Sequence, residues 1–364
     1  MPKSILPEEL KNKKDIIFGE VKPFIRKADF SVVNLEAPII KDKISPIRKS
    51  GPSLCVDTST VEVLKDVGFD VFTLANNHFY DQGQTGVEET IEACLLNGVK
   101  VVGGGKNIED ARKLLILEKE DKRVAIINAC EHEFSIATNE HGGSNPLDLI
   151  NIQEDIENAR KVAHYVVLIL HGGIEHYQYP TPRMRRWYRH FVDMGADAVI
   201  NHHQHCINGY EVYNSKPIFY GLGNFYFPWG SQRRPDSWKY GYAVELVLGD
   251  IIQFDLLPYK QTIDGVFLRD KIDFEREIEL LNNSIKDDNL FIKFEEYISS
   301  RKFSLLIDLL PSFMHWRFIE AIVRRGVFGT LYHGKELYNV SNKLTCESHL
   351  EQLQNVFRQL MKKE

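Results

Sequence analysis

Residues Tyr165–Gly173 read YVVLILHGG and give the clearest indication of the fold. The run Tyr165–Leu170 carries no charge and is rich in Val and Ile, which is typical of a strand buried on both faces of a parallel sheet. The imidazole of His171 follows directly, and two glycines then allow close approach of the backbone. The segment therefore predicts a buried strand that delivers a histidine to the edge of a sheet.

Similar apolar runs alternate with amphipathic stretches from about Asp29 to Phe227, which is typical of an α/β sheet with covered faces. The expected strands are Phe30–Asn34, Val71–Leu74, Val101–Val102, Val124–Asn128, Tyr165–Leu170, Ala198–Asn201 and Ile218–Gly221, and the expected helices are Thr58–Val67, Gly86–Leu96, Glu109–Leu115, Ile152–Val162 and Arg183–Met194.

The pattern changes in the second half of the chain. Tyr242–Leu248 and Ile251–Leu257 predict two antiparallel strands joined at Gly249-Asp250. Beyond about Asp270 the sequence predicts mainly helices, at Glu275–Ser284, Asp288–Ser299, Ser304–Leu309, Pro311–Arg325 and Ser348–Lys363.

The composition bounds the class of protein. With 364 residues, of which 43% are hydrophobic, the chain can bury a large core in one large α/β unit with an appendage, or in several domains. A net charge of −6 with both signs dispersed argues against sequence-independent binding to nucleic acid. Five scattered cysteines without a CxxC motif disfavour a disulfide framework and a thiolate zinc site. No apolar run approaches the roughly 20 residues that span a bilayer, and no signal peptide is evident, so we expect a cytoplasmic chain.

A histidine cluster follows the expected strand Ala198–Asn201, because His202, His203 and His205 fall within four positions. Neutral imidazole is a common metal ligand. On an extended backbone His203 and His205 would face the same side, so they could bind one metal or one metal each, while His202 points elsewhere. A surface loop that merely contains histidines is the alternative, and three imidazoles in four residues favour the metal site.

Polar residues follow other expected strands as well. Asn77 could ligate a cation while His78 protonates a leaving group, although an Asn-rich turn explains this motif equally well. A divalent cation also needs a carboxylate, for which Glu36 is the candidate; an exposed Glu at a strand end is the alternative. Glu131, within Glu131-His132-Glu133, is a second acidic candidate.

Two further groups lie close to His171 in the sequence. Glu175 and His176 could support the ligands from behind or belong to an ordinary turn. Arg183, at the start of an expected helix, could bind a substrate phosphate or carboxylate, or belong to a solvated face.

Six ordered motifs between about Asp15 and Phe227 together resemble the CapA family, the capsule and poly-γ-glutamate synthesis proteins related to calcineurin-like metallophosphoesterases. The motifs are Asn34–Pro38, Leu74–His78 with Asp81–Gly83, Gly103–Asn107 with Asp110-Ala111, His171–Glu175, His202–His205 and Tyr220–Phe225. The resemblance implies an α/β metallophosphoesterase-like four-layer sandwich, with two mixed β-sheets flanked by helices, over residues 1–265. We expect residues 266–364 to form a helical C-terminal extension.

The resemblance also implies roles for single residues. Glu36 is expected to bridge two metals, with Asn77, His171 and His203 on one metal and His205 on the other; one or two divalent ions of Mn, Fe or Zn would suit this set. His78 is implied as catalytic acid or transition-state stabiliser, with Asp81 beside it. Residues expected near the substrate are Asn34, Asn76, Glu131, Glu175, Arg183 and Asn224, with His202 and His176 behind the ligands. Two metals would share a hydroxide that attacks phosphorus in line.

The chain departs from the family pattern in two places. Members normally open with an apolar strand ending in Gly-Asp, whose Asp binds a metal, whereas Asp15–Glu20 resembles the later, pre-helix segment. Either that strand precedes the printed sequence, in which case a membrane-associated or extracytoplasmic location is expected, or one ligand is lost. In addition, Asn201 replaces the glycine usual before the histidine pair.

Three functional hypotheses follow from the residues and the resemblance. The first is a metal-dependent hydrolase of the phosphoesterase type, acting on an anionic small molecule or polymer in capsule or poly-γ-glutamate metabolism. The second is a non-catalytic accessory protein that binds the polymer or the synthesis proteins. The third is hydrolysis or transfer at a γ-glutamyl amide by the same metals. A fold alone does not decide among them.

Overall fold

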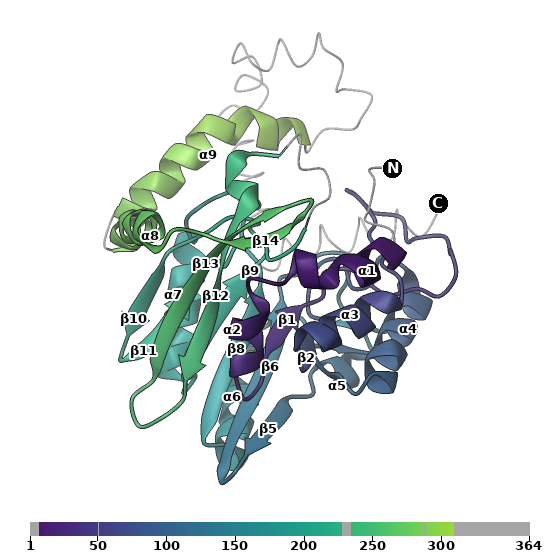
Figure 1. Ribbon diagram of the computed structural model, residues 1–364. Coiled ribbons are helices and arrows are strands. Elements are labelled where there is room, and N and C mark those ends of the chain that lie inside the picture. The colour runs from purple at the N-terminus through teal and green to yellow at the C-terminus, as the bar shows by residue number, and fades with distance from the viewer. Residues whose placement is uncertain (1–6, 50, 228–233, 287–288, 309–364) are drawn as a thin grey trace. The chain divides into compact units, whose positions relative to one another are not determined.

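The computed structural model describes residues 7–49, 51–227, 234–286 and 289–308 (Figure 1). The chain divides into two compact units after Phe291. The boundary expected after residue 265 falls within the first of these units, Met1–Phe291. Helix α8 (Lys271–Ile285) belongs to this first unit, because it buries Phe274 and Leu281 against strands of the fold. In the described part of the chain, no helix has the length and apolar character needed to cross a bilayer.

A six-stranded mixed sheet forms one layer of the fold, in the order β10-β11-β9-β8-β6-β5. Strands β6, β8, β9 and β11 run parallel, and β5 and β10 are antiparallel edges. The strands are β5 (Leu115–Lys119), β6 (Lys122–Cys130), β8 (Tyr165–His171), β9 (Ala198–His202), β10 (Tyr210–Tyr213) and β11 (Lys216–Phe219). The apolar run Tyr165–Leu170 thus forms the central strand β8, which is buried from Val166 to His171.

Two smaller sheets face the six-stranded sheet. One is parallel, β1 (Val32–Asn34), β2 (Val71–Thr73) and β3 (Lys100–Val102), and the other antiparallel, β12 (Tyr240–Val247), β13 (Gln253–Thr262) and β14 (Gly265–Leu268). A short ribbon pairs β4 (Gly104–Gly105) with β7 (Gly143–Ser144). The second layer therefore consists of separate sheets rather than the single mixed sheet that we expected, since β1 and β12 do not pair with each other.

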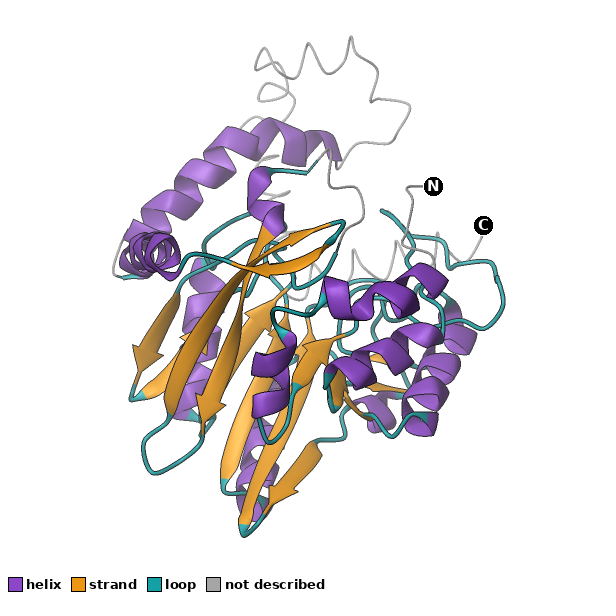
Figure 2. Cartoon of the chain, in the orientation of Figure 1, coloured by secondary structure: helices purple, strands orange, loops and turns teal. Residues whose placement is uncertain are grey.

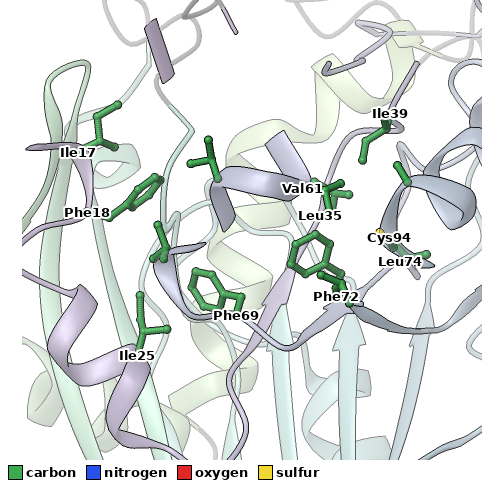
Figure 3. Close-up of a cluster of buried hydrophobic side chains, with 14 of the residues drawn as sticks. Ile17, Phe18, Ile25, Leu35, Ile39, Val61, Phe69, Phe72, Leu74 and Cys94 are labelled. Carbon is green, nitrogen blue, oxygen red and sulfur yellow. The ribbon is translucent and has the colours of Figure 1, made fainter. Parts of the chain in front are cut away.

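Helices cover the outer faces of both layers (Figure 2). On the six-stranded sheet lie α6 (Leu149–Val162) and α7 (Pro182–Asp193). The parallel sheet packs against α1 (Pro7–Ile17), α2 (Lys22–Lys27), α3 (Ser59–Val67) and α4 (Gly83–Leu96). Figure 3 shows this second core, in which Phe18, Phe69 and Phe72 are buried together. The expected α/β sandwich with flanking helices is confirmed.

A capping side chain and a proline fix the start of α7. The Thr181 side chain accepts a hydrogen bond from the Met184 amide and Pro182 occupies the first turn of α7, a favoured start for a helix. The remaining helices are α5 (Ile108–Ala111), the 3₁₀ helix Asp236–Lys239 and α9 (Asn289–Asp308).

Some expected elements were wrong. The helix expected at Glu109–Leu115 ends at Ala111, because Leu115 opens β5, which pairs with β6 as a hairpin. Ser304 belongs to α9, which continues without a break from Asn289, rather than to a separate helix. Strands β5, β10 and β14 and helices α1 and α2 were not anticipated. The helices expected at Pro311–Arg325 and Ser348–Lys363 lie outside the described residues.

Asn128 links the two sheet layers beneath the site through hydrogen bonds. Its buried side chain accepts a hydrogen bond from the Ala75 amide (2.8 Å) and donates one to the Ile169 carbonyl (2.8 Å). Gly103 lies so close that a Cβ there would be 2.0 Å from Asn128 Oδ1. The side chain therefore positions the end of β2, which carries Asn77 and His78, against β8.

We expect Asn128→Leu to destabilise the protein by roughly 1–3 kcal/mol or more, because the Ala75 N–H loses its partner in a buried place. Urea unfolding followed by circular dichroism measures this change. Asn158→Leu, on the exposed face of α6, is the control and should stay within about 0.5 kcal/mol of the original protein. An equal effect of both variants would contradict the linking role of Asn128.

Candidate metal centre

The predicted ligands come together where the parallel strands end. Cys130, His171 and His202 are neighbours in register at the ends of β6, β8 and β9. Glu36 follows β1 and Asn77 follows β2. Because the carboxyl ends of parallel strands meet at one edge, loops far apart in the sequence share this place.

His171 lies at the centre of the cluster. Its Nε2 atom is 3.0 Å from Asn77 Oδ1 and 3.0 Å from His203 Nδ1, and its Nδ1 atom is 2.7 Å from His202 Nδ1. Potential ligand atoms of Glu36, His171 and His203 all lie within 4.8 Å of one another. The structure thus brings four of the five predicted ligands into direct contact or close approach around one point.

The fifth predicted ligand, His205, faces Glu36. Its Nε2 atom is 3.4 Å from Glu36 Oε1, and its Nδ1 atom is 2.8 Å from Asn224 Oδ1. The Asn224 amide nitrogen donates to the carbonyls of His205 and Trp238, which fixes the amide orientation. His205 must therefore donate from Nδ1 and present an unprotonated Nε2 toward Glu36.

We expected His203 and His205 to face the same side of an extended backbone, and this was wrong. β9 ends at His202, and His203 and His205 have positive φ angles of 110° and 56° rather than an extended conformation. Such angles are uncommon for side chains with a Cβ and are typical of functional turns. Both imidazoles reach the cluster through this turn, with ring centroids 6.1 Å apart.

Burial controls the charge states of the cluster. It lowers the pKa of His171 and His205 well below the usual value, assisted by neighbouring imidazoles, and lowers the pKa of His202 to about 3. Burial, followed by the nearby carboxylates of Glu175 and Glu133, raises the pKa of Glu36 to about 8. His171, His202 and His205 are therefore neutral, the state in which imidazole binds a metal, and the Glu36 carboxylate lacks a compensating charge.

The residues present fit a divalent cation. Glu36 Oε1 is buried without a hydrogen-bond partner among the described residues, and it faces the Nε2 lone pair of His205. Two acceptors in this position need either a proton or a cation between them. The set of carboxylate, imidazole and amide oxygen suits Mn, Fe or Zn.

His78 and Asp81 form a second cluster beside the ligands. His78 Nδ1 is 2.7 Å from Asp81 Oδ2, and both side chains are buried. Lys49 also contacts both groups: its ammonium pairs with Asp81 and lies 3.1 Å from His78 Nδ1, and its side chain is only 3% exposed. Lys49 was not predicted from the sequence, because a lysine in the loop before residue 50 belongs to no motif.

The side chains of Asn34 and Asn76, which we expected near the substrate, form hydrogen bonds within the protein. Asn76 donates to the Leu35 carbonyl (2.9 Å) and to Asn34 Oδ1 (3.2 Å), and accepts from the His78 amide. Asn34 in turn donates to Glu36 Oε2 (3.2 Å). These contacts give Asn34 and Asn76 a positioning role toward Glu36 and His78, as Asn224 has toward His205.

The remaining predicted residues lie around this centre. Arg183 pairs with Glu131 and stacks on the Trp187 ring at 4.6 Å. The charge of Glu175 contributes, after burial, to the raised pKa of Glu36. The ring of His176 is 6.4 Å from that of His205. Glu133, which we named only within an acidic motif, lies 3.3 Å from the Asn77 amide nitrogen and 3.7 Å from His203 Nε2. Trp238, not anticipated, packs against His205 at 4.5 Å.

A family model described as "Bacterial capsule synthesis protein PGA_cap" matches residues 1–228 of the chain. The chain belongs to the PGA_cap family. The match covers the strands and loops that carry all five predicted ligands, from Glu36 to His205, so the resemblance seen in the sequence motifs is confirmed.

Relatives of this PGA_cap chain carry names from polymer synthesis. The chain is 33% identical over 231 residues to "Capsule biosynthesis protein CapA" of Bacillus anthracis, covering 61% of this chain and 56% of that protein. It is also 33% identical over 227 residues to "PGA biosynthesis protein CapA" of Bacillus subtilis (strain 168), covering 61% of this chain and 60% of the relative. The chain thus matches somewhat more than half the length of these two proteins.

Among solved structures, the PGA_cap chain is similar to one titled as a novel phosphatase from Mycoplasma pneumoniae. The two share 13% sequence identity and a TM-score of 0.41, over 74% of this chain and 94% of the other. A similarity of this size says nothing about activity.

Proposed function

We propose that this chain is a metal-dependent hydrolase of the phosphoester type, acting on an anionic substrate in capsule or poly-γ-glutamate metabolism. The observation that carries the proposal is the presence of two adjacent clusters: the convergent candidate ligands around His171, and the buried His78–Asp81 pair beside them. The family membership supplies the biological context.

Glu36, Asn77, His171 and His203 would hold one metal, and Glu36 with His205 a second. Bound divalent metal would supply Lewis-acid polarisation of the substrate and activation of water. Behind these ligands, His202 contacts Nδ1 of His171 and Asn224 contacts Nδ1 of His205, so each ligand imidazole is oriented by a second polar group.

His78 is proposed as the proton donor to the leaving group. Asp81 contacts its Nδ1, which fixes the ring and leaves Nε2 for the substrate. Lys49 balances the charge of Asp81, so the buried carboxylate is compensated when His78 is neutral.

Arg183 is proposed as a contact for the anionic substrate. Its side chain is 42% exposed, unlike the buried ligands, and it pairs with Glu131, whose backbone amide donates to the His171 carbonyl. A planar guanidinium at this rim suits either a phosphate or a carboxylate.

A non-catalytic accessory role is the second proposal. One relative, from Mycobacterium tuberculosis (strain ATCC 25618 / H37Rv), is named for an accessory role in polyglutamine synthesis and is 25% identical over 256 residues. In that case the centre would bind metal and polymer without turnover. Hydrolysis or transfer at a γ-glutamyl amide would use the same residues and is separated only by its substrate.

The test is a substrate panel on metal-loaded protein, with bis(p-nitrophenyl) phosphate, p-nitrophenyl phosphate and γ-glutamyl-p-nitroanilide. We expect phosphoester turnover that EDTA removes and that His78→Asn lowers by roughly 10²–10⁴-fold, because general acid catalysis contributes about that much. Metal content of the variant should be unchanged.

His164→Asn is the matched control, since His164 is exposed and its ring Nδ1 accepts a hydrogen bond from the Arg123 amide, away from the ligands. Turnover of the amide alone would move the proposal to γ-glutamyl chemistry. Stoichiometric metal without turnover on any of the three compounds would favour the accessory role.

A further inference from the structure

Arg234 lies at the rim of the candidate metal centre, on the side of His205. Its guanidinium carbon is 4.5 Å from the centroid of the Trp238 ring, and that ring packs against the His205 imidazole with a centroid distance of 4.5 Å. A guanidinium above an indole face is held by a cation–π interaction and donates hydrogen bonds from its edge. The stack therefore places a permanent positive charge beside a predicted metal ligand.

The Trp238 side chain is a fixed support for this charge. It is buried, and its Nε1 atom donates a hydrogen bond to the Phe227 carbonyl at 3.1 Å. The Trp238 carbonyl accepts hydrogen bonds from the side-chain amides of Asn224 and Gln261, both at 3.0 Å. Because Asn224 also contacts Nδ1 of His205, one side chain positions both the ligand and the support of the guanidinium.

His176 gives Arg234 a second anchor. Arg234 Nη1 is 3.3 Å from His176 Nε2, and since a guanidinium can only donate, the imidazole nitrogen accepts. The backbone amide of His176 donates to the Gln204 carbonyl at 2.8 Å, within the turn that carries His203 and His205. Contacts to Trp238 and to His176 thus fix Arg234 relative to the ligands in two independent ways.

The surroundings of Arg234 suit an anionic group. The carboxylate of Glu175 lies 3.9 Å from the same nitrogen of His176, so a carboxylate fits beside this imidazole. Burial is the main cause of the lowered pKa of His205, and the charge of Arg234 adds to it, so the field of the guanidinium extends to the ligands. An anionic group next to Arg234 would therefore be stabilised by the guanidinium and would lie close to a molecule held at His205.

We propose that Arg234 binds a second anionic group of the substrate, next to the group that the metals hold, and that it makes the chain selective for molecules with two anionic groups. The contacts of the guanidinium to Trp238 and His176 place it beside the ligand set rather than within it. The group at the metals and the group at Arg234 are therefore different parts of one molecule. A carboxylate and a phosphate both match the planar guanidinium. This inference rests on the proposed function, because it concerns the substrate of the same centre.

The test is calorimetric titration of Mn²⁺-loaded protein with 3-phosphoglycerate and glycerol 3-phosphate, which differ only in a carboxylate that replaces a hydroxymethyl group. We expect 3-phosphoglycerate to bind at least about tenfold more tightly, because hydrogen bonds between charged groups are strong. Arg234→Gln should weaken binding of 3-phosphoglycerate by at least about tenfold and change that of glycerol 3-phosphate by less than about twofold. Arg234→Lys should keep part of the preference, since it retains the charge but not the planar fork.

Lys239→Gln is the matched control, because Lys239 is a cation of the same segment that is 42% exposed and pairs with Asp236 at 2.7 Å. It should leave both affinities unchanged, and the metal content and thermal midpoint of Arg234→Gln should equal those of the original protein. Equal weakening of both ligands in Arg234→Gln, an unchanged preference in that variant, or no preference in the original protein would each overturn the proposal. Since the measurement is binding, absence of turnover on the substrate panel would contradict the hydrolase proposal separately.

Discussion

Replacing His171 by alanine is expected to lower the affinity for Mn²⁺ or Zn²⁺ by at least about 100-fold. His171 Nε2 lies between Asn77 Oδ1 and His203 Nδ1, so its loss removes the group that the other ligands surround. Mutation of a residue that supports a metal ligand typically lowers the metal affinity by about 10–100-fold, and mutation of a ligand itself should lower it further. Calorimetric titration and elemental analysis of tag-free protein measure the loss.

The matched control for His171→Ala is His164→Ala, which removes an exposed imidazole from the other end of the same strand layer. Because His171 is buried, His171→Gln serves as a second variant of similar size that preserves folding. Undiminished metal content in His171→Gln would contradict the assignment of this residue as a ligand.

The second large effect concerns pH. We expect the metal-free protein to be most stable near pH 6.5–7 and to lose stability on both sides. On the acid side the cause is the buried histidines: the pKa of His202 is lowered to about 3, and those of His171 and His205 also lie well below the unfolded value of about 6.5. Between these values the unfolded state binds more protons, so the free energy of unfolding falls as the pH falls.

On the alkaline side the cause is Glu36. Its pKa is raised from 4.5 to about 8, so the folded state holds the proton more tightly than the unfolded state. The stability that this gives is complete below about pH 4.5 and is lost as the pH rises through 8. At pH 4.5–6.5 the histidines oppose Glu36 and outnumber it, so the acid loss still dominates, by on the order of a few kcal/mol.

Thermal unfolding in EDTA between about pH 5 and 9 tests both limbs. Glu36→Gln should remove the alkaline loss and leave the acid loss, because it keeps the size of the side chain without the charge. Addition of Mn²⁺ at pH 8 should raise the thermal midpoint of the original protein, since the cation compensates the carboxylate. If neither Glu36→Gln nor Mn²⁺ changed the thermal midpoint at pH 8, the proposed centre would be contradicted.

The amino-acid sequence by itself determined the alternation of strands and helices and the ends of the parallel strands. The run Tyr165–Leu170 forms all but the last residue of β8, and Ala198–Asn201 forms all but the last residue of β9, because a continuous apolar run is stable only inside a covered sheet. The loops expected to carry ligands follow from the same rule, since parallel strands end at one edge.

Elements with weak local signals could not be predicted. β5 and β10 are antiparallel edges whose residues are partly exposed, and their conformation depends on pairing with β6 and β11 rather than on a pattern of their own. Lys49 gave no signal either, because its position beside Asp81 depends on a loop closing over residues more than thirty positions away.

Only the tertiary structure decided how the candidate ligands meet and which strands pair. The positive φ angles at His203 and His205 turn both imidazoles toward Glu36, a conformation no local pattern specified. Likewise, the separation of β1 from β12 arises because strand pairing is set by long-range register, not by the residues of either strand. Apolar periodicity fixes which residues are buried, whereas the contacts between distant strand ends fix the chemistry of the centre.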